Sequence, residues 1–116
     1  MQKKVAMVVF RGEMLCFVHV MLNAVDMRSK GYDVKVIIEG ESTKLLPRFL
    51  DRSEPFRNLF NDVLGHGMID CACKACANKM GTIRSAQELG IELRSEMSGH
   101  PSISRMMEAG YEVITF

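Results

Sequence analysis

Short apolar runs alternate along the chain with longer segments in which apolar residues recur at helical spacing. The run at 4–10, KVAMVVF, is almost continuously apolar, which is typical of a strand covered on both faces of a sheet. Apolar residues at helical spacing then predict a helix that ends at Lys30-Gly31. The run at 34–38, VKVII, predicts a second strand. A strand, a helix and a strand in this order predict two parallel strands joined by a right-handed crossover.

The second half of the chain continues this alternation. One helix is expected to start at Ser53 and another at Pro101. In the helix that starts at Pro101, Ile103, Met106 and Met107 would face the core. The other predicted elements are helices at 42–50, 74–80 and 85–89 and strands at 68–72, 91–93 and 111–116.

Alternating strands and helices predict a three-layer α/β/α fold of the flavodoxin-like kind, with a mainly parallel sheet of about five strands. A chain of 116 residues is long enough for one such domain, and we assign residues 1–116 to it. The loops that leave the carboxyl ends of parallel strands gather at one edge of the sheet, where ligands usually bind. The segments expected to share this edge are 11–13, 40–42, 73–76 and 98–100.

Composition and charge exclude several classes of partner. The formal net charge is +1, with acidic and basic residues interspersed, so no nucleic-acid partner is expected.

His19 and Asn23 interrupt the longest apolar stretch, which argues against a membrane span. No targeting segment is visible, and we expect a cytoplasmic protein with reduced thiols. Neither G-x-G-x-x-G nor G-x-x-x-x-G-K-[ST] occurs, and no cofactor is expected.

The segment CACKAC at 71–76 contains three of the four cysteines. Cys73 and Cys76 form a C-x-x-C pair where a strand is expected to give way to a helix. The start of the helix and the nearby Lys74 would stabilise a thiolate there. We therefore expect Cys73 to be the leading nucleophile and Cys76 to resolve, relay or shield it. Cys71 is expected to point into a sheet face and to pack in the core.

Two other interpretations of the cysteines stay open. Cys71, Cys73 and Cys76, with His66 as a fourth ligand, could hold zinc or an iron–sulfur centre. Alternatively, the cysteines only pack, and the protein is a non-catalytic oligomeric binding module. His100, at the expected shared edge, could act as acid or base near the thiols, or could simply belong to the start of a helix.

The first predicted helix is apolar on more than one face. Its apolar residues form one stripe with further residues beside it: Leu15, Val18, Leu22 and Val25, then Phe17, Met21 and Ala24. In so small a domain this surplus predicts a subunit contact rather than a solvated outer face, and we expect a homo-oligomer.

Three segments stand in an order that resembles a known family. They are GYDVKVIIEG, a strand leading into CKACANKMG, and the terminal AGYEVITF. This order is similar to that of the DsrE/DsrF-like family, and the resemblance covers nearly the whole chain. It implies a three-layer α/β/α domain, commonly assembled into trimers or hexamers.

The same resemblance implies a function. In the sulfur-relay members a cysteine after a central strand carries sulfur as a persulfide, and by position this residue would be Cys73, with Cys76 as a second thiol. The leading hypothesis is therefore a sulfurtransferase-like carrier. It would accept sulfane sulfur from a donor protein and pass it to the thiol of an acceptor protein, with His100 as acid or base.

Overall fold

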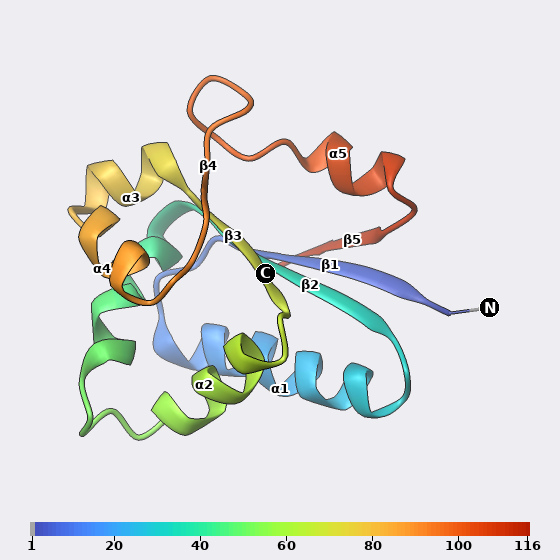
Figure 1. Ribbon diagram of the computed structural model, residues 1–116, viewed down its shortest axis with the longest axis horizontal. Helices are drawn as coiled ribbons and strands as arrows, with labels where there is room; N and C mark the ends of the chain where they lie inside the picture. Colours follow the sequence, from blue (N-terminus) through green and yellow to red (C-terminus); the bar gives the residue numbers. More distant parts are fainter. Residues whose placement is uncertain (1) are drawn as a thin grey trace.

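A computed structural model describes residues 2–116, which form a five-stranded sheet in the order β4-β3-β2-β1-β5. Every pairing between neighbouring strands is parallel, and helices lie on both faces of the sheet (Figure 1). The expected α/β/α fold with a parallel sheet is confirmed. The strands are β1 (Lys4–Val9), β2 (Asp33–Ile38), β3 (Ile69–Cys73), β4 (Leu93–Arg94) and β5 (Glu112–Thr115).

The helices connect these strands in chain order. The chain moves outward from β1 to β4 and then returns to add β5 on the free side of β1. The helical segments are α1 (Met14–Ser29), the 3₁₀ segment η1 (Gly40–Leu50), α2 (Arg57–Gly65), α3 (Lys74–Met80), α4 (Ile83–Glu88) and α5 (Ile103–Glu108).

Most of the core lies on the sheet face that α1 and α2 cover (Figure 1). Phe17 of α1, Phe49 of η1 and Phe60 of α2 are all fully buried there. The rings of Phe49 and Phe60 stack with their centroids 4.0 Å apart. The aromatic cluster therefore ties three connecting segments together and anchors η1 to the core.

The opposite face carries a smaller core beneath α5. Its buried members are Ala6, Val8, Ile37, Cys71 and Met106. Cys71 is fully buried, as the alternation along its strand predicted. This cysteine packs as a small apolar side chain within the sheet.

The helix predicted from Ser53 starts later, at Arg57. Residues before it form turns instead, because the Ser53 amide donates a hydrogen bond to Asp51 Oδ1. Glu54 turns inward, where its side chain is only 2% exposed and lies 2.7 Å from Arg48 Nη2. Local hydrogen bonds and this ion pair replace the expected first helical turn.

Helix α5 also starts later than predicted, at Ile103 rather than Pro101. The Ser102 amide donates a hydrogen bond to Glu96 Oε1 at 2.9 Å, which holds the preceding backbone outside the helix. Met107 is 63% exposed, so the expectation that it faces the core is wrong. Adjacent residues of a helix point about 100° apart, and a helix this short buries only one side.

Helix α1 divides its apolar residues between the core and the surface. Phe17, Met21 and Ala24 are fully buried, whereas Leu15 and Leu22 are 67% and 51% exposed. The outward leucines leave an apolar row on the outer side of the helix. Within residues 2–116, no helix is long and apolar enough to cross a membrane.

Candidate functional site

The neighbouring strands β2 and β3 bring two functional side chains to one edge of the sheet. The register of these strands shifts between Val36 and Ile37, after which Ile38 pairs with Ala72. Glu39 comes directly after the paired residue of β2, and Cys73 directly after that of β3. The two side chains therefore belong to adjacent positions at the carboxyl ends of parallel strands, where ligands usually bind.

Cys73 is both the last residue of β3 and the cap of α3. Its backbone is extended, with φ −67° and ψ 121°, and its sulfur accepts a hydrogen bond from the Cys76 amide at 3.3 Å. The tight turn into α3 places the Cys76 side chain beside that of Cys73. The cysteine spacing thus produces a paired-thiol arrangement at the start of the helix.

The third segment of the site is the loop that carries His100. Ser98 and Gly99 have positive φ values of 49° and 91°, which turn the chain back toward α3. The Gly99 carbonyl accepts a hydrogen bond from the Ala75 amide at 2.9 Å and lies 3.7 Å from Cys73 Sγ. These contacts attach the loop to α3 and place His100 over the thiols.

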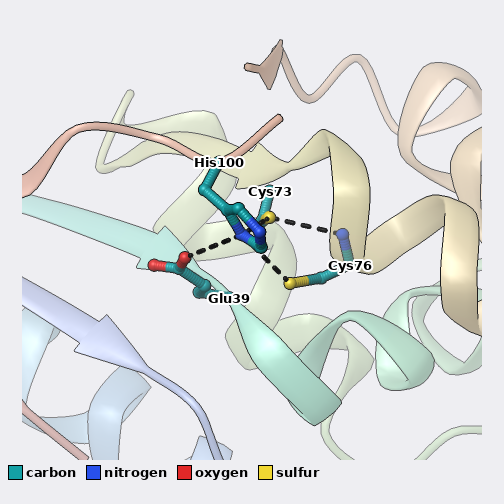
Figure 2. A group of neighbouring side chains, drawn as sticks. All are labelled: Glu39, Cys73, Cys76 and His100. Atoms are coloured by element: carbon teal, nitrogen blue, oxygen red, sulfur yellow. Dashed lines mark hydrogen bonds and ion pairs between the residues drawn. The ribbon is translucent and has the colours of Figure 1, made fainter. Parts of the chain in front are cut away.

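The imidazole of His100 lies at the centre of the group (Figure 2). Its Nδ1 is 3.1 Å from Cys73 Sγ, 3.8 Å from Cys76 Sγ and 3.4 Å from Glu39 Oε1. One nitrogen atom therefore faces both sulfurs and the carboxylate. This position suits a proton acceptor or donor for either thiol, and it equally suits a metal ligand.

Burial distinguishes the members of the group. Cys73 is fully buried, and this burial, together with its hydrogen bond to the Cys76 side chain, raises the pKa of the Cys73 thiol to about 12. Burial also raises the pKa of Glu39, although the neighbouring His100 opposes that shift. Glu39 is 8% exposed, and its second carboxylate oxygen, Oε2, is buried without a hydrogen-bond partner among residues 2–116.

A pocket of about 460 Å³ opens beside the group. Cys76, which is half-buried, and His100 belong to its lining, so the Cys76 side chain is the one that faces the pocket. Cys73 is fully buried and is not among the lining residues. Apart from Cys76 and His100, the lining consists of Gly40, Glu41, Ala75, Lys79 and Met80.

The structure brings together three of the residues singled out from the sequence, namely Cys73, Cys76 and His100. It does not bring His66 or Cys71 to them. The ring of His66 contacts Asp62 at 3.0 Å, and His66 lines a different pocket. Cys71 is enclosed in the core beneath α5.

Glu39 is the member of the group that the sequence analysis missed. The sequence does contain a signal for it, namely that a charged residue directly follows a strongly apolar strand. The same pattern also occurs where a strand simply ends in solvent, so it does not by itself indicate a functional residue. Arg11 follows β1 as expected, but it lines another pocket with Cys16, His19 and Phe116. Only three of the four loops at this edge therefore contribute to the group around His100.

The assembled donor atoms are chemically diverse. One carboxylate oxygen, two sulfurs and one imidazole nitrogen, from Glu39, Cys73, Cys76 and His100, all lie within 4.8 Å of one another. Such a group can ionise a thiol, exchange a proton with a bound sulfur compound, or ligate a metal ion.

Comparison with known proteins identifies one relative that matches nearly the full length of the chain and others that match part of it. The uncharacterized protein MJ0733 of Methanocaldococcus jannaschii is 27% identical, over 96% of this chain and 93% of its own. An uncharacterized protein of Archaeoglobus fulgidus is 43% identical over all of its own length but only 32% of this chain.

A solved structure has the same fold. The conserved protein of unknown function BT1422 from Bacteroides thetaiotaomicron superimposes with a TM-score of 0.75, over 98% of this chain and 95% of its own, at 18% sequence identity. The sequence model of the DsrE/DsrF-like family matches residues 3–116. With the fold and this match over essentially the whole chain, the protein belongs to the DsrE/DsrF-like family.

Proposed function

We propose that this protein is a sulfur carrier that accepts sulfane sulfur on Cys76 as a persulfide and passes it to the thiol of a partner protein. The observation that carries the proposal is the half-buried Cys76 in the lining of the pocket, beside His100. Membership of a family associated with sulfur relay supports it. The proposal assigns the carrier role to Cys76 rather than to Cys73, the residue expected from the sequence, because Cys73 is fully buried.

The loading step is a thiol–persulfide exchange. The Cys76 sulfur attacks the outer sulfur of a donor persulfide, R–S–SH, and the S–S bond of the donor breaks. Cys76–S–SH forms, and the donor leaves as a thiolate that takes up a proton. No oxidant or reductant is consumed, because the S–S bond of the donor is replaced by the S–S bond of the carrier.

His100 and Cys73 assist Cys76 in this step. His100 Nδ1, 3.8 Å from Cys76 Sγ, accepts the thiol proton and returns it to the leaving donor thiolate. Cys73, whose pKa is raised to about 12, remains a thiol at neutral pH and can donate a hydrogen bond to the Cys76 thiolate. Delivery is the reverse exchange, in which an acceptor thiolate attacks the outer sulfur and restores Cys76.

The test is to treat reduced, chelator-treated protein with a persulfide donor and to measure the mass of the intact chain. The wild type is expected to gain one sulfur atom, located on the peptide that contains Cys76. Cys76→Ser should abolish the gain. Cys73→Ser should retain it, because serine keeps a donor beside Cys76.

Cys16→Ser is the matched control, since Cys16 is also half-buried but lies in α1, outside the group. It should load like the wild type. A wild type that gains no sulfur, or a Cys76→Ser variant that still gains it, would contradict the proposal.

A further inference from the structure

We propose that Glu39, Cys73, Cys76 and His100 form a closed, four-coordinate site for Zn²⁺. The donor atoms would be Glu39 Oε1, both Sγ atoms and His100 Nδ1, which come from three segments of the chain. This set differs from the ligands considered from the sequence, because Glu39 and His100 replace Cys71 and His66.

The first argument is the spacing of the donor atoms. Zinc bonds of about 2.0–2.3 Å in a tetrahedron place neighbouring donor atoms about 3.3–3.8 Å apart. The separations from His100 Nδ1 are 3.1, 3.8 and 3.4 Å to Cys73 Sγ, Cys76 Sγ and Glu39 Oε1, and all four atoms lie within 4.8 Å of one another. Each ligand would have to move by only about half an ångström to reach tetrahedral geometry.

The second argument is the carboxylate of Glu39. The residue is 8% exposed, and in the described part of the chain its Oε2 is buried without a hydrogen-bond partner, while Oε1 lies 3.4 Å from the imidazole of His100. A buried carboxylate normally has its lone pairs satisfied by several donors or by a cation. A divalent cation between Oε1 and the sulfurs would supply the missing positive charge.

The third argument is the donor chemistry. Two thiolates and an imidazole exclude Mg²⁺ and Ca²⁺, which prefer oxygen, and the carboxylate is a poor ligand for Cu⁺. Zinc binds sulfur, nitrogen and carboxylate oxygen in tetrahedral sites. On binding, Zn²⁺ forms bonds to both sulfurs, and the two thiol protons of Cys73 and Cys76 are released to solvent.

The surrounding backbone holds the ligands in place before any metal arrives. The hydrogen bond from the Cys76 amide to Cys73 Sγ fixes the pair of sulfurs. The Gly99 carbonyl accepts a hydrogen bond from the Ala75 amide, which fixes the loop beside the sulfurs. Preorganised ligands lose little conformational entropy when the ion binds.

Metal binding has a consequence that rests on the proposed function. Coordination to zinc uses one lone pair of the Cys76 sulfur and lowers its nucleophilicity, so zinc-bound protein should load sulfur more slowly than metal-free protein. Zinc would therefore restrain Cys76 until an acceptor of the metal removed it.

The experiment is a titration of reduced, metal-free protein with Co²⁺, followed by Zn²⁺, without oxygen. One equivalent of Co²⁺ should produce sulfur-to-cobalt charge-transfer bands and the intense visible bands of tetrahedral cobalt, and Zn²⁺ should abolish both. Glu39→Gln and His100→Ala should each weaken binding at least about tenfold, since even groups that only orient a ligand have effects of that size.

Cys76→Ser should lower the charge-transfer intensity by about half, because the Cys73 sulfur remains as one of the two sulfur ligands. Cys16→Ser and His66→Asn are controls, because neither residue belongs to the group, and both should bind like the wild type. Circular dichroism of the metal-free variants checks that each one is folded.

Wild-type protein that shows no tetrahedral cobalt spectrum would overturn the proposal, and so would a Cys76→Ser variant whose charge-transfer intensity equals that of the wild type. A folded Glu39→Gln variant with unchanged affinity would overturn the four-ligand site. Sulfur loading is measured on metal-free protein, so its failure and the failure of metal binding can be told apart.

Discussion

Asp70 is a carboxylate that two arginines hold in the ionised form. Its side chain is 11% exposed, and Oδ2 lies 2.6 Å from Arg105 Nη2 and 3.5 Å from Arg94 Nε. Burial opposes ionisation, but hydrogen bonds from Arg105 and Cys71 and the charges of both arginines outweigh it and hold the pKa of Asp70 below its ordinary value. Its contribution to stability is therefore complete above the ordinary pKa and is lost as the pH falls through the lowered one.

Asp70→Asn tests this effect. The substitution is expected to lower the free energy of unfolding at pH 7 by about 1.5–3 kcal/mol, the range for hydrogen bonds to charged groups. Urea denaturation at a series of pH values should show that the difference from the wild type shrinks below the ordinary Asp pKa of 3.8. Asp26→Asn is the control, because Asp26 forms an exposed ion pair with Lys30, and it should change stability by less than about 1 kcal/mol. A difference that stays constant at every pH would contradict the assignment.

At the scale of single elements, the path of the segment between β4 and α5 depends on a glycine, Gly99. Gly99 adopts φ +91°, and a Cβ built on it would lie 3.0 Å from the Ala75 side chain. The residue at position 99 must therefore be small, because α3 lies close by, and it must also tolerate a positive φ. The contact between this loop and α3 also positions His100.

Gly99→Ala is expected to destabilise the protein and to slow the loading of sulfur on Cys76, because the added methyl group pushes the loop and its imidazole away from α3. Gly31→Ala is a matched control, since Gly31 has a similar φ of +85° but a methyl group added there would meet no atom of residues 2–116 within 4 Å. Gly31→Ala should cost about 1 kcal/mol of stability from backbone strain and leave loading unchanged. Thermal unfolding and the rate of the mass gain are the two measurements. Equal loading rates in both variants would contradict the positioning role of this loop.

Some elements could be predicted from sequence because their signals are local. Continuous apolar runs identified β1 and β2 nearly to the residue, and the helix predicted at 74–80 has the same bounds as α3. The start of α2 was misplaced because the buried pair between Glu54 and Arg48 depends on tertiary contacts. Glu39 was overlooked for the same reason, since only the fold shows that its carboxylate is buried beside His100.

At the scale of the whole molecule, the order of strands could not be predicted. Apolar patterns show that a segment is a buried strand but not which neighbour it pairs with. The return of β5 to the side of β1 depends on contacts such as Val5 with Glu112 and on the Phe10 amide, which donates to the Phe116 carbonyl at 2.8 Å. That the loops after the strands gather at one edge of the sheet could nevertheless be predicted, because the carboxyl ends of all strands in a parallel sheet lie at the same edge.

The homo-oligomer stays a prediction, and the outer side of α1 is where it can be tested. Leu15 and Leu22 are exposed large apolar residues on one helix, and burying them between subunits would stabilise an assembly. The double substitution Leu15→Glu and Leu22→Glu should reduce the molar mass measured by light scattering to that of a smaller species. Asn23→Glu, an exposed change on the same helix, should not. A wild type that is monomeric throughout would contradict the prediction.

The shift in register between β2 and β3 has a consequence for how the site could arise. Val36 pairs with Ile69 and Ile37 with Cys71, so β3 contains one more residue than its neighbour at this point, namely Asp70. If Asp70 instead paired with Ile37 in a regular ladder, Ala72 rather than Cys73 would stand beside Glu39. An irregularity of one amino acid, placed well inside the sheet and held by arginines, thus determines which side chain meets the carboxylate at the rim.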